Sequence, residues 1–153
     1  MALKDDMTQL NNIHDLLEDS RKGYTEAAER AEAGHVKELL RHLSTSRTSL
    51  IEAVAALRRK ADPEATPREG GTLKGDLHRA WMDLRDALSK SENANVLSEC
   101  ERGEEFLLMR YDEVVEKEVA PETYALAQSQ RAVVEGNLER IKDLRKRFEH
   151  VEH

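Results

Sequence analysis

The sequence predicts an all-α protein, and its composition and length indicate this fold class. Of its 153 residues, 39% are hydrophobic and 36% are charged, which suits long helices with one buried stripe and a solvated outer face. Aromatic residues make up only 4%, and there are only seven glycines and three prolines to interrupt helices. A chain of this length fits one domain, so we expect residues 1–153 to form a single helical bundle.

The first helix is expected over residues 6–32, where apolar or small side chains recur every three or four residues. These positions are Leu10, Ile13, Leu17, Ser20, Tyr24, Ala27, Ala28 and Ala31. Asp5 and Asp6 can cap the start of this helix, and Gly34 can supply the left-handed position just beyond its end.

The second helix is expected over residues 35–61, again with a periodic stripe. The stripe consists of Val36, Leu39, Leu40, Leu43, Ser46, Arg47, Leu50, Val54 and Leu57. Because the turn between the first two helices is so short, they must pack antiparallel. Residues 62–71 follow with two prolines and two glycines, which indicates a loop.

Three further helices are expected. A shorter one covers residues 73–89, with Thr72 as its cap and an apolar stripe at Leu73, Leu77, Ala80, Trp81, Leu84 and Leu88. The next covers residues 93–118, with its stripe at Val96, Leu97, Cys100, Glu101, Glu104, Leu107, Leu108, Tyr111, Val114 and Val115. Pro121 suits the first turn of the last helix, over residues 121–151, with its stripe at Tyr124, Ala127, Arg131, Val134, Leu138, Ile141, Leu144, Arg145 and Phe148.

The crossover over residues 62–92 is long enough to run back along the whole bundle, so the helices at 35–61 and 93–118 can lie parallel. Two antiparallel hairpins joined by one long crossover, here containing a fifth, shorter helix, form the ferritin-like four-helix-bundle topology. A plain up-down-up-down bundle is the alternative, but it leaves the helix at 73–89 without an obvious purpose.

The most distinctive part of the sequence is GTLKGDLHRAWMDLR, residues 71–85. Together with GYTEAA at residues 23–28 and ERGEE at residues 101–105, it resembles an uncharacterised bacterial family of ferritin-like four-helix-bundle proteins. The resemblance covers nearly the whole chain. It implies a fold and no activity, because the family carries a domain-of-unknown-function label and fold alone does not transfer function.

Ferritin-like folds often hold two iron or manganese ions, bound by a Glu from each of two helices and a Glu-x-x-His pair from each of the other two. The expected histidines are missing: Ala55 stands three residues after Glu52, and Leu138 three residues after Glu135. We therefore expect no cofactor. The alternative is a degenerate or single-metal carboxylate site for iron or manganese around Glu101 and Glu104.

Polar residues interrupt the apolar stripes near the middle of the predicted bundle. Glu104 and Arg131 fall on the stripes of their helices, and Arg47 touches that of the second helix. Ser20 and Ser46 fall at corresponding levels of the first hairpin. Because an unpaired buried carboxylate is costly, the pattern predicts a buried polar layer in which these residues pair without metal.

Charge and cysteine content limit the classes of partner and compartment. The formal net charge of −7 argues against a nucleic-acid role that rests on phosphate neutralisation. Cys100 is the single cysteine, which excludes an internal disulfide and suits a reducing compartment. We expect this thiol to be passive, because Glu99 and Glu101 beside it disfavour the thiolate. No secretory signal and no apolar run of ~20 residues is visible, so we expect a cytoplasmic protein without a membrane partner.

These observations favour a non-enzymatic bundle that associates with itself, as a homo-oligomer, or with another protein. The crossover carries the most distinctive sequence, and we expect His78, Trp81 and Met82 to form the partner surface. The main alternative is an iron- or manganese-binding or oxidising protein that uses Glu101 and Glu104. A third hypothesis is a stress-related role, which no residue of the sequence supports or excludes.

Overall fold

The computed structural model of the chain describes residues 3–32, 34–66, 75–90 and 92–152, and these ranges contain helices and connections without a strand. The elements are α1 (Leu3–Arg30), α2 (His35–Ala61), α3 (Gly75–Ser89), α4 (Asn93–Val115) and α5 (Pro121–Glu152). The prediction of an all-α helical bundle is confirmed. In the described part of the chain, each helix is too short or too polar to cross a lipid bilayer.

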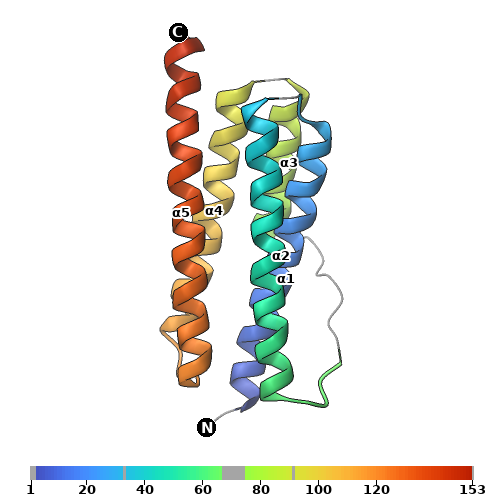
Figure 1. Cartoon of the computed structure of the whole chain (residues 1–153), viewed down its shortest axis with the longest axis vertical. Coiled ribbons are helices and arrows are strands. Elements are labelled where there is room, and N and C mark those ends of the chain that lie inside the picture. Colours follow the sequence, from blue (N-terminus) through green and yellow to red (C-terminus); the bar gives the residue numbers. More distant parts are fainter. Residues whose placement is uncertain (1–2, 33, 67–74, 91, 153) are drawn as a thin grey trace.

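The four long helices form two antiparallel pairs, α1 with α2 and α4 with α5 (Figure 1). Helices α2 and α4 point in the same direction, so the chain returns along the bundle between them (Figure 1). The shorter α3 packs on α4 and α1 and reaches along only part of their length (Figure 1). Helix α3 is therefore an additional helix that covers α1 and α4 at one end of the bundle only.

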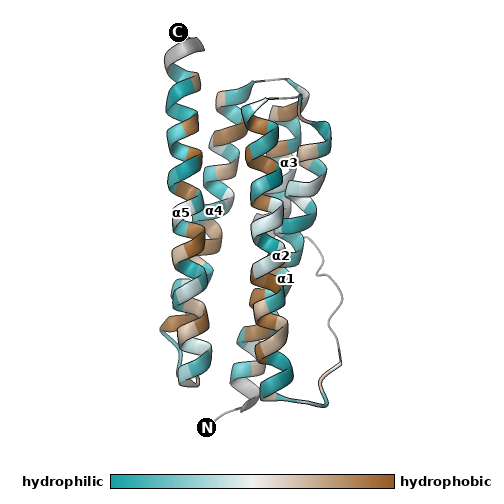
Figure 2. Ribbon diagram, in the orientation of Figure 1, coloured by the Kyte–Doolittle hydropathy of each residue, from teal (hydrophilic) through white to brown (hydrophobic). Residues whose placement is uncertain are grey.

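The hydrophobic core consists of two clusters stacked along the bundle, and Figure 2 shows apolar residues on the faces that the long helices turn towards one another. The cluster near the α1–α2 turn includes Leu39, Leu40, Leu43, Val96, Leu97 and Ile141. The cluster near the α4–α5 turn includes Leu10, Leu17, Val54, Tyr111 and Val134. Burying each of these large aliphatic side chains contributes about 1.5–3 kcal/mol relative to exposure.

Gly34 is the N-cap residue just before α2, whereas the sequence suggested that it ends the preceding helix. Helix α1 ends at Arg30, two residues before the predicted end, because the tight connection to α2 uses the residues that follow. Gly34 has a backbone φ of 134°, a conformation that residues other than glycine rarely adopt. Its carbonyl oxygen accepts the first hydrogen bond of α2 from the backbone N–H of Glu38, at 3.1 Å.

Asp6 caps the start of α5 and not that of its own helix. It is buried within α1, and its Oδ2 accepts hydrogen bonds from the backbone N–H of Ala120 at 3.0 Å and from Thr123 Oγ1 at 2.9 Å. A carboxylate is favourable at this helix N-terminus. Helix α4 ends at Val115 rather than at residue 118, since the chain must turn and become extended before Pro121. The predicted cap Thr72 and the predicted helix start at residue 73 lie outside the described residues.

The contact between α3 and α1 depends on Gly23. A Cβ atom placed on Gly23 would lie 3.2 Å from Cε3 of Trp81, so the indole ring rests directly on the backbone of α1. Trp81 is partly buried there and packs against the apolar cluster near the α1–α2 turn. The glycine in the middle of α1 is therefore explained by packing and not by a turn.

Substitution of Gly23 by alanine tests this contact, with Gly136→Ala as the matched control. Both glycines are helical, but an added Cβ at Gly136 meets no atom within 4 Å. Gly136→Ala is expected to raise the free energy of unfolding by ~0.5–1 kcal/mol through helix propensity alone. Gly23→Ala is expected to gain less or to lose stability, and to shift the fluorescence emission of Trp81, the only tryptophan. Equal gains and an unchanged emission spectrum would contradict the packing.

Candidate functional site

A buried ion pair between Arg47 of α2 and Glu104 of α4 lies at the centre of the bundle. The Arg47 side chain is 0% exposed and that of Glu104 is 1% exposed. Nη2 of Arg47 donates to both carboxylate oxygens of Glu104. The pair joins the two hairpins, because α2 belongs to the first and α4 to the second.

Helix α1 supplies two further groups to this pair. Ser20 Oγ accepts a hydrogen bond from Nε of Arg47 at 2.9 Å, and the hydroxyl of Tyr24 donates to Oε2 of Glu104 at 3.1 Å. The guanidinium carbon of Arg47 also lies 5.6 Å from the centre of the Tyr24 ring, a cation–π distance. Nη1 of Arg47 has no hydrogen-bond partner among the described residues. The structure thus brings Glu104, Arg47 and Ser20 together, as the sequence suggested, and adds Tyr24.

The ionisation of the cluster follows from burial and pairing. Desolvation is the largest single influence and would lower the pKa of Arg47. The charge of Glu104, together with contributions from Tyr24, from the hydrogen bond to Glu104 and from Tyr111, outweighs it and raises that pKa, so the guanidinium stays charged. Burial, and then the nearby Glu104 charge, raise the pKa of the Tyr24 hydroxyl and of the Cys100 thiol. Tyr24 and Cys100 therefore stay protonated near neutral pH, and the thiol is not activated as a nucleophile.

Arg131 is not part of the buried layer, so this part of the prediction is wrong. Its side chain is 32% exposed and pairs with Asp112 of α4 at 2.6 Å and with Glu135 at 2.8 Å. Although Arg131 falls on the stripe of α5, it lies at the edge that faces α4. Its long side chain can therefore reach carboxylates at the surface.

Helix α5 contributes Asn137 at the level of the polar layer. Asn137 lies between Val134 of one apolar cluster and Ile141 of the other. Its Nδ2 donates to Ser46 Oγ at 3.1 Å, and its Oδ1 lies 3.2 Å from Nε2 of His42. Ser46 is thus half-buried and bonded to α5 rather than to the Arg47–Glu104 pair. The sequence signal for Asn137 was a polar residue three positions after Val134 and four before Ile141.

A second buried polar contact, which sequence reasoning missed, joins α4, α5 and α2 further along the bundle. The hydroxyl of Tyr111 donates to Oε1 of Gln130 at 2.7 Å, and Nε2 of Gln130 donates to the carbonyl oxygen of Leu50 at 3.0 Å. Burial raises the pKa of Tyr111, so its hydroxyl remains a donor. These bonds satisfy polar groups that α4, α5 and α2 bury together.

The two carboxylates considered as metal ligands are both paired with arginines. Glu104 is held by Arg47, and Glu101 accepts hydrogen bonds from Nε and Nη2 of Arg145 on α5, the latter at 3.3 Å. Glu101 and Glu104 do not come together with a third ligand: across the described residues, no group of three or more His, Cys, Asp or Glu side chains is placed to hold a metal ion. Because both carboxylates are occupied by arginines, Glu101 and Glu104 do not present free oxygens to a shared cation.

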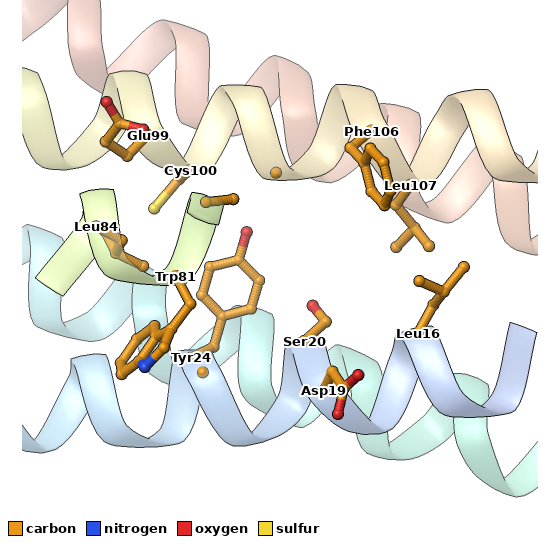
Figure 3. Close-up of a pocket in the computed structure, with 13 residues that line it drawn as sticks. Leu16, Asp19, Ser20, Tyr24, Trp81, Leu84, Glu99, Cys100, Phe106 and Leu107 are labelled. Carbon is orange, nitrogen blue, oxygen red and sulfur yellow. The ribbon is translucent and has the colours of Figure 1, made fainter. Parts of the chain in front are cut away.

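A cavity lies beside the polar layer, between α1, α3 and α4 (Figure 3). It offers about 50 Å³ to water-sized molecules, and most of its lining is apolar. Figure 3 shows Leu16 and Phe106 at one end and Trp81 and Leu84 at the other, where α3 covers the cavity. Two carboxylates, Asp19 of α1 and Glu99 of α4, also line it.

The residues expected to form a partner surface lie on α3 in different surroundings. Trp81 is largely occupied by its packing on α1, while Met82 is 45% exposed. The side chain of His78 lies outside the described part of the structure. Of the three, Met82 is thus the side chain that the structure presents to solvent.

Comparison with known proteins identifies a family but no individual relative. Residues 5–117, from α1 to just beyond the end of α4, match the family described as a domain of unknown function, DUF2383. The match stops before α5, so it covers less of the chain than the resemblance over nearly its whole length implied. No curated protein and no solved structure shows significant similarity to the chain. The chain therefore belongs to the family of the domain of unknown function DUF2383.

Proposed function

We propose that this chain is a ferritin-like, non-enzymatic bundle that works by associating with protein surfaces. The observation that carries the proposal is the position of the Arg47 guanidinium, which binds both oxygens of Glu104 at the bundle centre. In metal-binding bundles of this topology, inward carboxylates at the centre are the ligands. Here the charge of the inward carboxylate is matched by an arginine of the same chain.

The directions of the helices support the ferritin-like part of the proposal. Two antiparallel hairpins with α2 and α4 parallel are what one long crossover connection produces in that topology (Figure 1). The carboxylate-based alternative, iron or manganese binding or oxidation, requires Glu101 and Glu104 to leave Arg145 and Arg47. Removing Glu104 from Arg47 would leave a fully buried guanidinium without its counter-charge, which costs several kcal/mol. We therefore favour association over metal chemistry.

Helix α3 is the element on which we place the association surface. It is an added layer on one side of the four long helices, and Met82 projects from it to solvent. Large exposed apolar side chains next to a packed aromatic residue are common at protein interfaces. We propose a second copy of the chain as the partner, in the cytoplasm, a location that the single unpaired cysteine supports.

Light scattering over a range of protein concentrations tests the association. The wild type is expected to form an oligomer whose population grows with concentration, and Met82→Glu is expected to shift it towards monomer by placing a charge in the interface. Met109→Glu is the matched control, because Met109 is 56% exposed on α4 and lies on the face opposite the buried residues of that helix. Both variants should melt close to the wild type, since neither side chain is buried.

A wild type that stays monomeric at all concentrations would contradict self-association. If the oligomer forms but Met109→Glu disrupts it as strongly as Met82→Glu does, the interface lies elsewhere than on α3.

A further inference from the structure

Helices α2 and α5 run side by side on the face of the bundle opposite to α3, which packs on α1 and α4 (Figure 1). Two contacts mark the sides by which they border each other. Nζ of Lys60 lies 2.8 Å from Oε2 of Glu122, and Nδ2 of Asn137 donates to Ser46 Oγ at 3.1 Å. Neither the ion pair at the bundle centre nor the proposed surface on α3 involves this face.

The middle of this face is uncharged. Between the two contacts, one stripe of each helix continues at helical spacing and consists of Ser49, Ala53 and Ala56 of α2, and Leu126, Ser129 and Val133 of α5. These six residues are called the α2–α5 face. Leu126 is partly buried and the other five are exposed, Val133 by 42%. Among the exposed side chains of residues 45–57 and 123–134, Glu52 is the only charged one, although 36% of the chain is charged.

Four charged side chains of alternating sign stand at the corners of the α2–α5 face. At one end, Lys60 of α2 pairs with Glu122 of α5. At the other end, Glu38 of α2 and Arg140 of α5 line the same groove between the two helices. The signs are therefore opposite across each end and also along each helix. All four side chains are exposed.

We propose that the α2–α5 face is an interface with a second copy of this chain. The pattern of its corners is self-complementary under both two-fold rotations that lie in the plane of the face. With the axis along the helices, Lys60 meets Glu122 of the second copy, and Arg140 meets Glu38 of the second copy. With the axis across the helices, Lys60 meets Glu38 of the second copy, and Arg140 meets Glu122 of the second copy.

The charges favour a second copy over other partners. A strongly basic or strongly acidic surface would meet two corners of its own sign, and nucleic acid would gain little phosphate neutralisation from an uncharged centre. Two copies of this chain each carry a net charge of −7, so they repel one another on most sides. Contact through the α2–α5 face keeps that repulsion low, because its centre is neutral and its corners match.

The size of the face is also that of an interface between proteins. The 22 residues from Glu38 to Lys60 span about 33 Å of helix, and two adjacent helices are about 20 Å wide, which gives roughly 600 Å² in projection. Stable interfaces bury about 800 Å² of accessible surface per partner. Because α3 lies on the opposite side of the bundle, this contact is additional to the one proposed on α3, and both together give an assembly larger than a dimer.

Sedimentation equilibrium of the full chain carrying Met82→Glu tests this interface without the α3 contact. This chain is expected to dimerise. Adding Val133→Glu is expected to raise the dissociation constant about 10-fold or more, because a carboxylate becomes buried at an uncharged position. Tyr124→Glu is the matched control, since Tyr124 is 45% exposed and lies on the opposite side of α5, nine residues away. It should leave the constant unchanged, and both variants should melt close to the parent chain.

Reversal of the corner charges tests the complementarity itself. Lys60→Glu should weaken the dimer, because it places like charges together in either two-fold arrangement. Reversing all four corners at once, with Lys60→Glu, Glu122→Lys, Glu38→Lys and Arg140→Glu, restores the alternation and should recover the affinity to within about threefold of the parent chain. Arg30→Glu, which changes the net charge as Lys60→Glu does but on α1, should have a smaller effect than Lys60→Glu.

Three results would overturn the interface: a Met82→Glu chain that stays monomeric at millimolar concentration, equal weakening by Val133→Glu and Tyr124→Glu, or a four-corner reversal that binds no more tightly than Lys60→Glu. The proposal on α3 fails separately. If it alone is wrong, the wild type and Met82→Glu will have the same dissociation constant, and Val133→Glu will still weaken the dimer.

Discussion

Arg47→Met is expected to lower the free energy of unfolding by about 3–5 kcal/mol, the largest effect that we expect from a single substitution. The substitution leaves Glu104 fully buried with only the Tyr24 hydroxyl as a donor, in place of a guanidinium. It also removes the donor to Ser20 and the cation over the Tyr24 ring. Chemical denaturation followed by circular dichroism measures the change.

The double variant Arg47→Met/Glu104→Met should recover most of this loss. Replacing a buried pair by apolar side chains of similar volume is often neutral or stabilising, because both desolvation penalties disappear together. It also removes the unpaired Nη1 of Arg47 and lets the two apolar clusters join. Arg131→Met, at the partly exposed position, should stay close to the wild type. Equal losses in Arg47→Met and Arg131→Met would contradict the burial of the pair.

Labelling of Cys100 by a thiol reagent at pH 8 is expected to be slower in the folded chain than in denaturant by a factor of about 10³ or more. Cys100 is the only cysteine and is 1% exposed. Its thiolate is the reactive form, and burial together with the Glu104 charge raises the thiol pKa. The reagent can therefore react only when the helices around α4 open.

The same labelling rate connects Cys100 to the ion pair. Arg47→Met should speed up the reaction, because weakening the contact between the two hairpins makes opening more frequent. Arg131→Met is again the control and should leave the rate unchanged. Rapid labelling of the wild type would mean that α4 is not packed against α1 at this position.

The helical periodicity of the sequence was sufficient to predict most of the fold. The stripe of α2 keeps its helical spacing along the whole helix, also where Arg47 takes an apolar position, and the helix covers the predicted residues 35–61. The ends that differ depend on tertiary contacts that a stripe does not contain. Asp6 illustrates this: its carboxylate accepts a hydrogen bond from the backbone N–H of Ala120, which is 114 positions away in the sequence.

The polar layer could be predicted only for residues whose burial follows from their position on the apolar face of a helix. Glu104 and Arg47 were found because they replace apolar residues at stripe positions and carry opposite charges. Arg131 occupies a similar position, but a long side chain at the edge of the stripe can reach solvent and local carboxylates. Asp19 lies off the stripe of α1, so only the packing of α1, α3 and α4 reveals that it is buried.

Metal analysis of the chain refolded with Fe(II) or Mn(II), alongside Glu104→Ala, tests most directly whether the bundle centre is a closed ion pair. We expect no stoichiometric metal in either protein and a lower melting temperature for Glu104→Ala, because Arg47 loses its buried counter-charge. Stoichiometric metal in the wild type that is lost in Glu104→Ala would contradict this account and favour a carboxylate metal site.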